Sequence, residues 1–151
     1  MTELRELIKE YLRRAKLMQL ATSEKDQPWV CSVWFAADDD LNLYWLSSIT
    51  RRHSDEVMKN DRVAGAIVLP QTPEDPPVGI QFQGTAGLLT SKEDIEKAFS
   101  VYAGRIFPVE KIREFMASEE KPHRFYRIRP VKYVLFDTVN YPENSRRELV
   151  L

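Results

Sequence analysis

Short apolar runs, separated by brief polar segments, follow one another from residue 17 to residue 48. The runs read LMQLAT (17–22), PWVCSVWFA (28–36) and LNLYWLSS (41–48), and they are rich in the β-branched and aromatic residues that favour strands. The segments between them, SEKDQ and ADDD, are of hairpin length, whereas parallel neighbours need a crossover of a dozen or more residues. We therefore predict antiparallel strands that are neighbours in the sequence and in the sheet.

The rest of the chain adds further strands and a few helices. At 78–90 the pattern alternates, with Gln81 and Gln83 on one side of a strand and apolar residues on the other, and Ser91 with Asp94 resembles a capping box that opens a helix. Further strands are expected at 62–70, 123–130, 131–138 and 146–151, and helices at 2–12, 53–60, 91–102 and 109–118. Because the helices do not alternate with the strands, a doubly wound α/β sheet is excluded. The prediction is a single α+β, mainly β, domain over residues 1–151, with antiparallel strands in a closed or nearly closed barrel and helices around it.

Composition and charge exclude several classes of protein. The chain has 151 residues and a net charge of −1, which argues against a nucleic-acid binder. Its single cysteine, Cys31, leaves no disulfide framework, and no window approaches the ~20 apolar residues of a membrane span or the apolar core of a signal peptide. We expect a cytoplasmic protein with no nucleic-acid and no membrane partner. His53, His123 and Cys31 are too far apart in sequence to predict a metal site.

Common catalytic motifs are missing from the sequence. It contains no GxGxxG, Walker-type loop, HExxH or CxxC. Ser48, His53 and Asp55 are residue types of a catalytic triad, but Ser48 lacks the strained elbow that makes such a serine reactive. The aspartates at 38–40 lie in a predicted hairpin and are expected to be solvated turn residues.

The stretch WLSSITRRHSD, residues 45–55, is the best candidate for a binding site. Hydroxyl residues end a strand there, and Arg51, Arg52 and His53 stand at the start of a short helix. Guanidinium groups beside free helix N–H groups suit an anion such as phosphate. The alternative is that the arginines are solvated and that Thr50 or Ser54 caps the helix.

Several segments together resemble a known family. They are LMQLATSEKDQPWVCSVWFAADDDLNLYWLSSITRRH, RVAGAIV, GIQFQGTA, RIFP and FYRIRPVKYVLFD. They resemble the pyridoxamine 5′-phosphate oxidase-like FMN-binding split barrels, and within that family a small single-domain branch that is poorly characterised. The resemblance implies a six-stranded antiparallel Greek-key split β-barrel with an N-terminal helix and two or three peripheral helices. It also implies a homodimer with FMN at the subunit interface.

The same resemblance assigns expected roles to particular residues. The strand-end hydroxyl and the two cations that grip the FMN phosphate fall on Ser47, Arg52 and His53, with Ser48 and Arg51 beside them. A histidine replaces the family's lysine, so this grip is expected to weaken as the pH rises and the imidazole loses its charge. Cys31 and Gly79 stand where the family has a phosphate-binding arginine and a flavin-contacting glutamine. Substitutes on the flavin side are expected to be the following: Gln81 and Gln83 through their amides, and Ser32 and Val33 through their main chain.

The leading functional prediction is a small FMN-dependent oxidoreductase that exchanges electrons with a nicotinamide or another small organic partner. Pyridoxamine 5′-phosphate oxidation itself is not expected, because the part that selects this substrate in true oxidases has no counterpart here. Two alternatives stay open. One is a protein that holds haem, with His53 or His123 as the axial ligand, or a deazaflavin. The other is a non-catalytic barrel that serves as a stress-response or sensor module.

Overall fold

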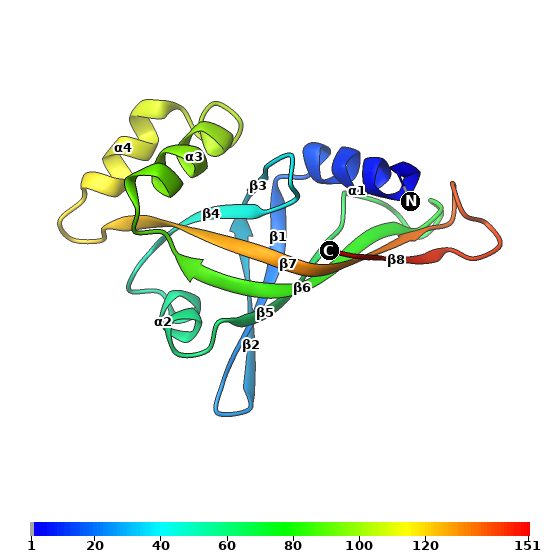
Figure 1. The fold of residues 1–151 in the computed structure, drawn as a ribbon, viewed down its shortest axis with the longest axis horizontal. Coiled ribbons are helices and arrows are strands. Elements are labelled where there is room, and N and C mark those ends of the chain that lie inside the picture. Colours follow the sequence, from blue (N-terminus) through cyan, green and yellow to red (C-terminus); the bar gives the residue numbers. More distant parts are fainter. Residues whose placement is uncertain (1) are drawn as a thin grey trace.

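The computed structural model describes residues 2–151 and confirms the α+β, mainly β, fold class (Figure 1). The helices are α1 (Thr2–Arg14), α2 (Arg52–Lys59), α3 (Lys92–Tyr102) and α4 (Val109–Ala117). The strands are β1 (Leu17–Glu24), β2 (Gln27–Trp34), β3 (Ala36–Ala37), β4 (Leu43–Ser48), β5 (Arg62–Ile67), β6 (Val78–Leu88), β7 (His123–Asp137) and β8 (Arg146–Val150).

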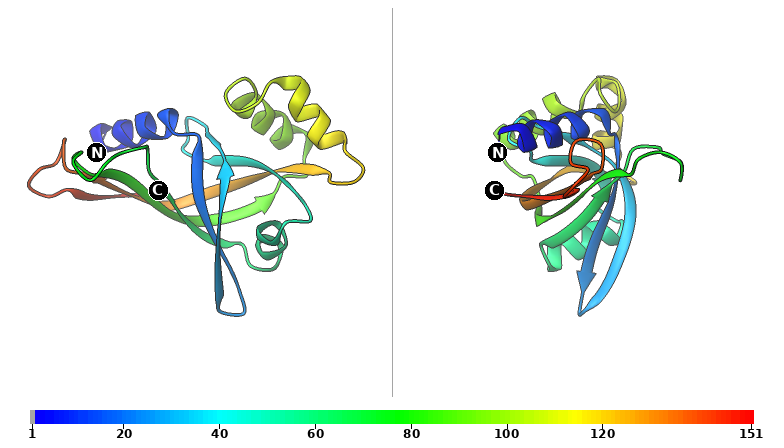
Figure 2. Two further views of the ribbon diagram at one scale, coloured as in Figure 1. Left: turned by 180° about the vertical axis from the view of Figure 1, so that it is seen from behind. Right: turned by 90° about the vertical axis from the view of Figure 1, so that its right-hand side faces the viewer.

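All the strands belong to one antiparallel sheet. Its order is β2-β1-β5-β6-β7-β4-β3, and β8 pairs with β7. The sheet is strongly curled into a half-barrel, as the two views in Figure 2 show. The strand count is higher than the six that the family resemblance implies, because the structure adds the two-residue strand β3 and the strand β8, which pairs only along the far half of β7. The predicted antiparallel pairing of sequence neighbours is confirmed for β1–β2 and for β3–β4, and the later neighbours β5–β6, β6–β7 and β7–β8 also pair in this way. In addition, β4 pairs with the distant β7.

The two strands predicted at 123–130 and 131–138 are wrong, because the chain continues through Pro130 as the single strand β7. The register with β6 shifts at this point: Gln83 is opposite Lys132, while Gly84 is opposite Pro130. The extra residue is a β-bulge, where the chain accommodates a proline that has no N–H to give to the ladder. Gly84 is required there, since a Cβ would lie 2.3 Å from the carbonyl oxygen of Arg129.

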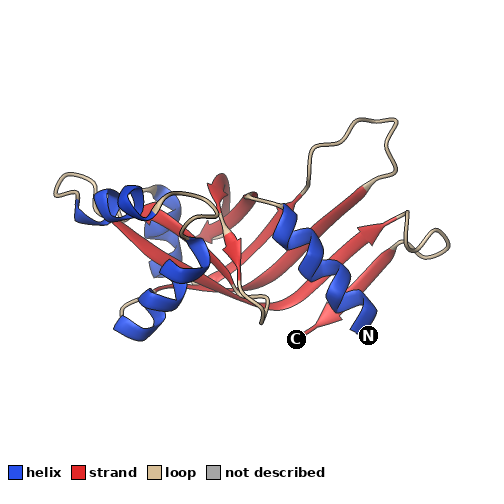
Figure 3. Ribbon diagram, turned by 90° about the horizontal axis from the view of Figure 1, so that it is seen from above, coloured by secondary structure: helices blue, strands red, loops and turns tan. Residues whose placement is uncertain are grey.

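Helices cover one side and one end of the sheet. Figure 3 shows α1 across the strands and α3 with α4 together at the end of the sheet. The apolar stripe of α1 is buried in the main core with residues of β1, β4, β6 and β7. Arg105, between α3 and α4, connects this end of the sheet to α1. Its guanidinium donates hydrogen bonds to the carbonyls of Leu12 at 3.2 Å and Ala15 at 2.9 Å, and also to that of Arg13. The Leu12 and Arg13 carbonyls are in the last turn of α1 and have no partner within the helix, and Ala15 follows directly after its end.

Two local predictions have opposite outcomes. The capping box is confirmed on its serine side, because Ser91 Oγ accepts a hydrogen bond from the N–H of Asp94 at 3.1 Å. The prediction of a solvated Asp38 is wrong: its carboxylate is buried and accepts from the backbone N–H groups of Asp40 and Asn42 and from the Tyr44 hydroxyl. Burial of the phenol and its bond to Asp38 raise the pKa of Tyr44 to about 12. The carboxylate therefore shapes the turn before β4 from inside.

The sheet has a core face and an open face. Side chains alternate between the faces, so the register decides which residues share one. On β1, β5, β6 and β7 the residues between the core positions point outward, and many of them are exposed. We define the open face by eight of these residues: Gln19, Ala21, Ala64, Ala66, Gln81, Gln83, Lys132 and Val134.

Candidate functional site

The junction between β4 and α2 is built by short hydroxyl side chains. Ser48 Oγ lies 2.8 Å from Thr50 Oγ1 and accepts from the Thr50 N–H, and Ser54 donates to the Ser48 carbonyl at 2.8 Å. The N-cap of α2 is Arg51, and its side chain makes no capping bond. The alternative in which Thr50 or Ser54 caps the helix is therefore wrong. Their hydroxyls instead brace the turn that carries Arg51 and Arg52.

Ser47 and His53 bind each other. Ser47 Oγ lies 2.9 Å from His53 Nε2, and both residues are buried. Burial, and then the charge of Arg51, lower the pKa of the His53 imidazole, while Glu56 opposes the shift. At neutral pH the ring is therefore uncharged, and its Nε2 is already engaged by the serine.

Arg52 is held by a carboxylate and an aromatic ring. Its Nε donates to Glu56 Oε2 at 2.7 Å, and its guanidinium lies 3.9 Å from the centre of the Trp29 ring. The Glu56 carboxylate is buried and also accepts from Thr22 Oγ1 at 2.8 Å. These contacts join α2 to β1 and β2. We call Thr22, Trp29, Arg52 and Glu56 the Glu56 cluster.

Arg51 differs from its neighbour. It is exposed, and within residues 2–151 no carboxylate lies within ion-pair distance of its side chain. Its position before the first turn of α2 places this free charge next to backbone N–H groups that have no acceptor within the helix. Arg51 with this helix start is the part of the junction best suited to an anion.

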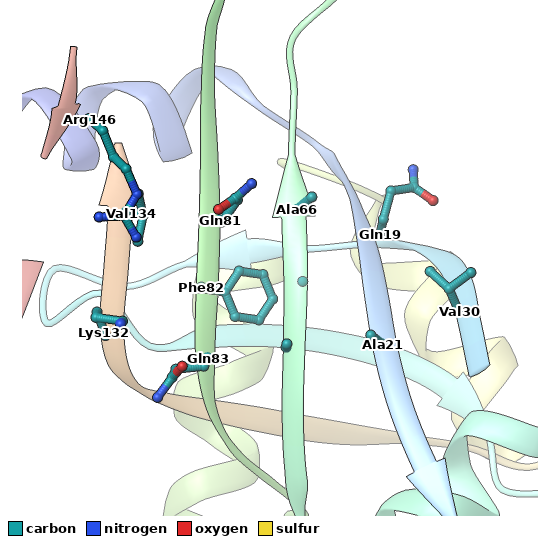
Figure 4. Close-up of a pocket in the computed structure, with 12 residues that line it drawn as sticks. Gln19, Ala21, Val30, Ala66, Gln81, Phe82, Gln83, Lys132, Val134 and Arg146 are labelled. Carbon is teal, nitrogen blue, oxygen red and sulfur yellow. The ribbon is translucent and has the colours of Figure 1, made fainter. Parts of the chain in front are cut away.

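A second candidate region is a hollow of about 450 Å³ on the open face. Figure 4 shows the residues that line it. Small residues of β1 and β5 form part of its floor, and Gln81 and Gln83 reach into it from β6. Within the described part of the chain, the side-chain amides of these two glutamines make no hydrogen bond. Lys132 and Arg146 stand at one margin and share Glu148, at 3.4 Å and 3.0 Å.

The nine residues predicted for the site divide between these regions. Ser47, Ser48, Arg51, Arg52 and His53 meet at the junction, whereas Gln81 and Gln83 line the hollow. Ser32 lies on the same face as the hollow, since it is opposite Gln19 and donates to its amide oxygen at 2.7 Å, while Val33 is buried on the core side.

The two regions lie on opposite faces of the sheet. Val57 of α2 packs in the main core with Met18 and Leu20, so α2 covers the core face, and Gln81 and Gln83 point the other way. One chain therefore does not bring the glutamines and the arginines onto the same ligand.

The sequence reasoning missed the Glu56 cluster and the role of Gln19. One signal was present, because Arg52 and Glu56 are four residues apart, the spacing at which a cation and a carboxylate meet on a helix.

Cys31 lies beside this cluster: burial, and then the charge of Glu56, raise the pKa of its thiol to about 11. A thiol with a raised pKa is a poor nucleophile, because the reactive form is the thiolate.

Other possible sites can be compared with these two regions. His123 Nδ1 bonds the Lys121 carbonyl, and the ring stacks on Phe115. Neither histidine lines the hollow of the open face. Residues 2–151 contain no cluster of His, Cys, Asp and Glu side chains arranged to hold a metal ion. None of the helices in this range is long and apolar enough to cross a membrane.

The geometry and the sequence place the chain in a family of split barrels. Residues 4–136 match the family described as Pyridoxamine 5′-phosphate oxidase, and the chain belongs to it. A relative, the UPF0306 protein PM1958 of Pasteurella multocida, is 28% identical over 94 residues, and the match spans 62% of this chain and 62% of the relative.

Solved structures share the fold. HutZ, the haem storage protein of Vibrio cholerae, superimposes with a TM-score of 0.69 at 20% identity, covering 83% of this chain and 88% of HutZ. A protein of Mesorhizobium loti described as FAD-binding has a TM-score of 0.63 at 20% identity, over 85% of this chain and 88% of that one.

Proposed function

We propose that two copies of this chain join through their open faces and bind FMN between them, and that the dimer is a small flavin-dependent oxidoreductase. Its electron partner is a nicotinamide or another small organic molecule. The observation that carries the proposal is the hollow of the open face, which contains the free amides of Gln81 and Gln83 and is bordered by exposed apolar side chains. A second copy on this face would close the hollow over the ring, and because one chain holds its arginine junction on the opposite face, any contact of the phosphate with a junction is made by that of the partner copy.

The open face has the properties of a surface that a second copy covers. A second hollow adjoins the first on this face. The apolar side chains around the two hollows are exposed: Val30 by 59%, Val68 by 56% and Phe136 by 43%. Monomeric proteins rarely leave a continuous apolar patch larger than a few hundred Å² in water. The adjacent hollows share Gln81, Val134 and Arg146, so they form one trough across β5, β6 and β7.

The residues of the hollow fit the ring system of a flavin. Its volume of about 450 Å³ lies within the usual range of ligand pockets. The small side chains of Ala64 and Ala66 leave room for a flat ring, and the free amides of Gln81 and Gln83 offer donors and acceptors to its polar edge. When bound, the flavin would supply the electron transfer, while these residues would hold and orient it and the second copy would exclude water.

The junction between β4 and α2 offers fewer free groups to a phosphate than its sequence suggests. Arg51 and the first N–H groups of α2 suit an anion, whereas Ser47, His53 and Arg52 already have partners within the chain. The proposal therefore rests on recognition of the ring more than of the phosphate. Haem has less support, because Nε2 of His53 is bound to Ser47 and neither histidine lines the hollow.

The test is to purify the protein without added cofactor, record its visible spectrum and identify what denaturation releases. One FMN for each chain, in a dimer by sedimentation, is the expected result. Ala64→Arg places a large cation on the open face and is expected to abolish both dimer and flavin. Ala117→Arg, at an exposed position of α4, is the matched control and is expected to keep both. A colourless monomer that does not bind FMN on titration would refute the proposal, and a haem spectrum would replace it.

A further inference from the structure

The charges at the start of α2 nearly cancel. Arg52 is paired with Glu56, and Asp55 is paired with Lys59 at 3.0 Å. Only Arg51 keeps a charge that no described carboxylate offsets. Arg52 therefore does not add a second net positive charge to the anion site, although the sequence places it there.

Glu56 is also fixed in its position. It lies between the Thr22 hydroxyl and the Arg52 Nε, at 2.8 Å and 2.7 Å, and only 2% of the residue is exposed. Its bonds to Arg52 and Thr22 lower the pKa of this carboxyl, so it is charged at neutral pH. Cys31 faces the same region from β2 and brings no charge there.

A phosphate at Arg52 would meet this carboxylate. If Arg52 kept its bond to Glu56, the phosphate would lie beside a like charge in a partly dry place, where repulsion is stronger than in water. If Arg52 left Glu56, a buried carboxylate would keep only its bond to Thr22, which is costly for a charged group. In both cases the gain from the new contact is largely offset.

We propose that Glu56 is a specificity-determining residue: by holding Arg52 it withdraws this cation from the anion site, so the chain binds its flavin through the ring and gains little from the phosphate. This inference rests on the proposed flavin function. It predicts that riboflavin, which lacks the phosphate, binds nearly as well as FMN. It also predicts that the preference for FMN rises when the charge of Glu56 is removed.

The experiment compares FMN and riboflavin affinities by titration of flavin fluorescence. For the unmodified chain the dissociation constants of FMN and riboflavin are expected to agree within about threefold. If the chain bound the phosphate firmly, each charge-assisted hydrogen bond would contribute ~1.5–3 kcal/mol, and FMN would bind roughly 10-fold to 100-fold more tightly than riboflavin. Glu56→Gln keeps an acceptor for Thr22 and removes the charge, and it is expected to raise the preference for FMN at least tenfold at low salt. Glu10→Gln, the same charge change on α1, is expected to leave the ratio unchanged.

Further variants and a second probe keep the inference falsifiable. In the double variant Arg52→Met/Glu56→Gln both charges are gone, and the FMN/riboflavin ratio is expected to equal that of the unmodified chain. Calorimetric titration with inorganic phosphate alone needs no flavin: Glu56→Gln is expected to bind it more tightly than the unmodified chain. If the unmodified chain binds neither FMN nor riboflavin, the flavin function is refuted. The titration with inorganic phosphate would still decide the role of Glu56. A hundredfold preference for FMN that Arg52→Met abolishes and Glu56→Gln leaves unchanged would overturn the inference alone.

Discussion

Replacing Arg52 by methionine tests whether the Glu56 cluster stabilises the fold. The substitution keeps an apolar stem against Trp29 and removes the cation from a carboxylate that is only 3% exposed. Breaking a fully buried ion pair costs ~3–5 kcal/mol, whereas an exposed pair is worth ~0.2–1 kcal/mol. The Arg52 side chain is 47% exposed and Thr22 still donates to Glu56, so the pair stands between these cases. We expect a loss of about 1–3 kcal/mol, or roughly 2–4 °C in Tm for each kcal/mol in a chain of this size.

The loss of stability in Arg52→Met is expected to depend on pH. In the native state the pKa of Glu56 is lowered from its ordinary value of 4.5, first by the bond to Arg52. A depressed carboxyl pKa contributes stability above the unfolded-state value, and this contribution is lost as the pH falls through the native value. The difference in unfolding free energy between the unmodified chain and Arg52→Met is therefore expected to be full at pH 7 and to shrink below pH 4.5.

The assay is urea unfolding, followed by circular dichroism, in a double-mutant cycle of Arg52→Met and Glu56→Gln. The two changes are expected to be coupled by about 1 kcal/mol or more, since residues in direct contact are not additive. Arg51→Met is the control at the neighbouring exposed arginine, with an expected change within ~0.5 kcal/mol. Additive effects in the cycle, or a loss in Arg52→Met that does not change with pH, would refute the reasoning.

Three more predictions concern the fold around the site. Gly84→Ala forces a Cβ against a carbonyl of β7 at the bulge and is expected to cost ~1–3 kcal/mol, whereas Gly87→Ala, with nothing within 4 Å, is expected to be nearly neutral by the same urea assay. His53 has a native pKa below 6.5, so its protonation favours the unfolded chain, and stability is expected to fall as the pH drops below 6.5; His53→Gln should reduce this acid-induced loss, and an unchanged pH profile would contradict the effect. Arg105→Met removes the bonds to the end of α1 and is expected to cost ~2–3 kcal/mol and to speed hydrogen exchange there, while Arg14→Met at an exposed position should not; equal exchange in both would disprove the capping role.

Local patterns in the sequence predicted much of the fold. The apolar runs at 17–22 and 28–36 became β1 and β2, and Ser91 caps α3 with the predicted bond. The alternation around Gln81 and Gln83 was visible in the sequence and is confirmed by their exposure on β6. Such features depend on residues that are close together along the chain, so periodicity and spacing are sufficient to find them.

Features that depend on distant residues were not predictable in the same way. The strand β7 continues through Pro130 only because Gly84 of β6 makes room for the bulge. Asp38 resembles any turn aspartate until the fold buries it under Tyr44. No local pattern relates Thr22 to Glu56, which lies 34 residues further along the chain.

The candidate site shows the same division. Residue types and their neighbours in the sequence are enough to indicate which residues could bind a flavin or an anion, since hydroxyls, arginines and amides are recognised in this way. The directions of these side chains and the partners that they already bind depend on the folded chain. The register of β1, β5 and β6 placed Gln81 and Gln83 on the open face, and the packing of α2 on β1 gave Arg52 to Glu56. Such features escape local patterns because the availability of a charge depends on every group within a few ångströms of it, and those groups come from distant parts of the chain.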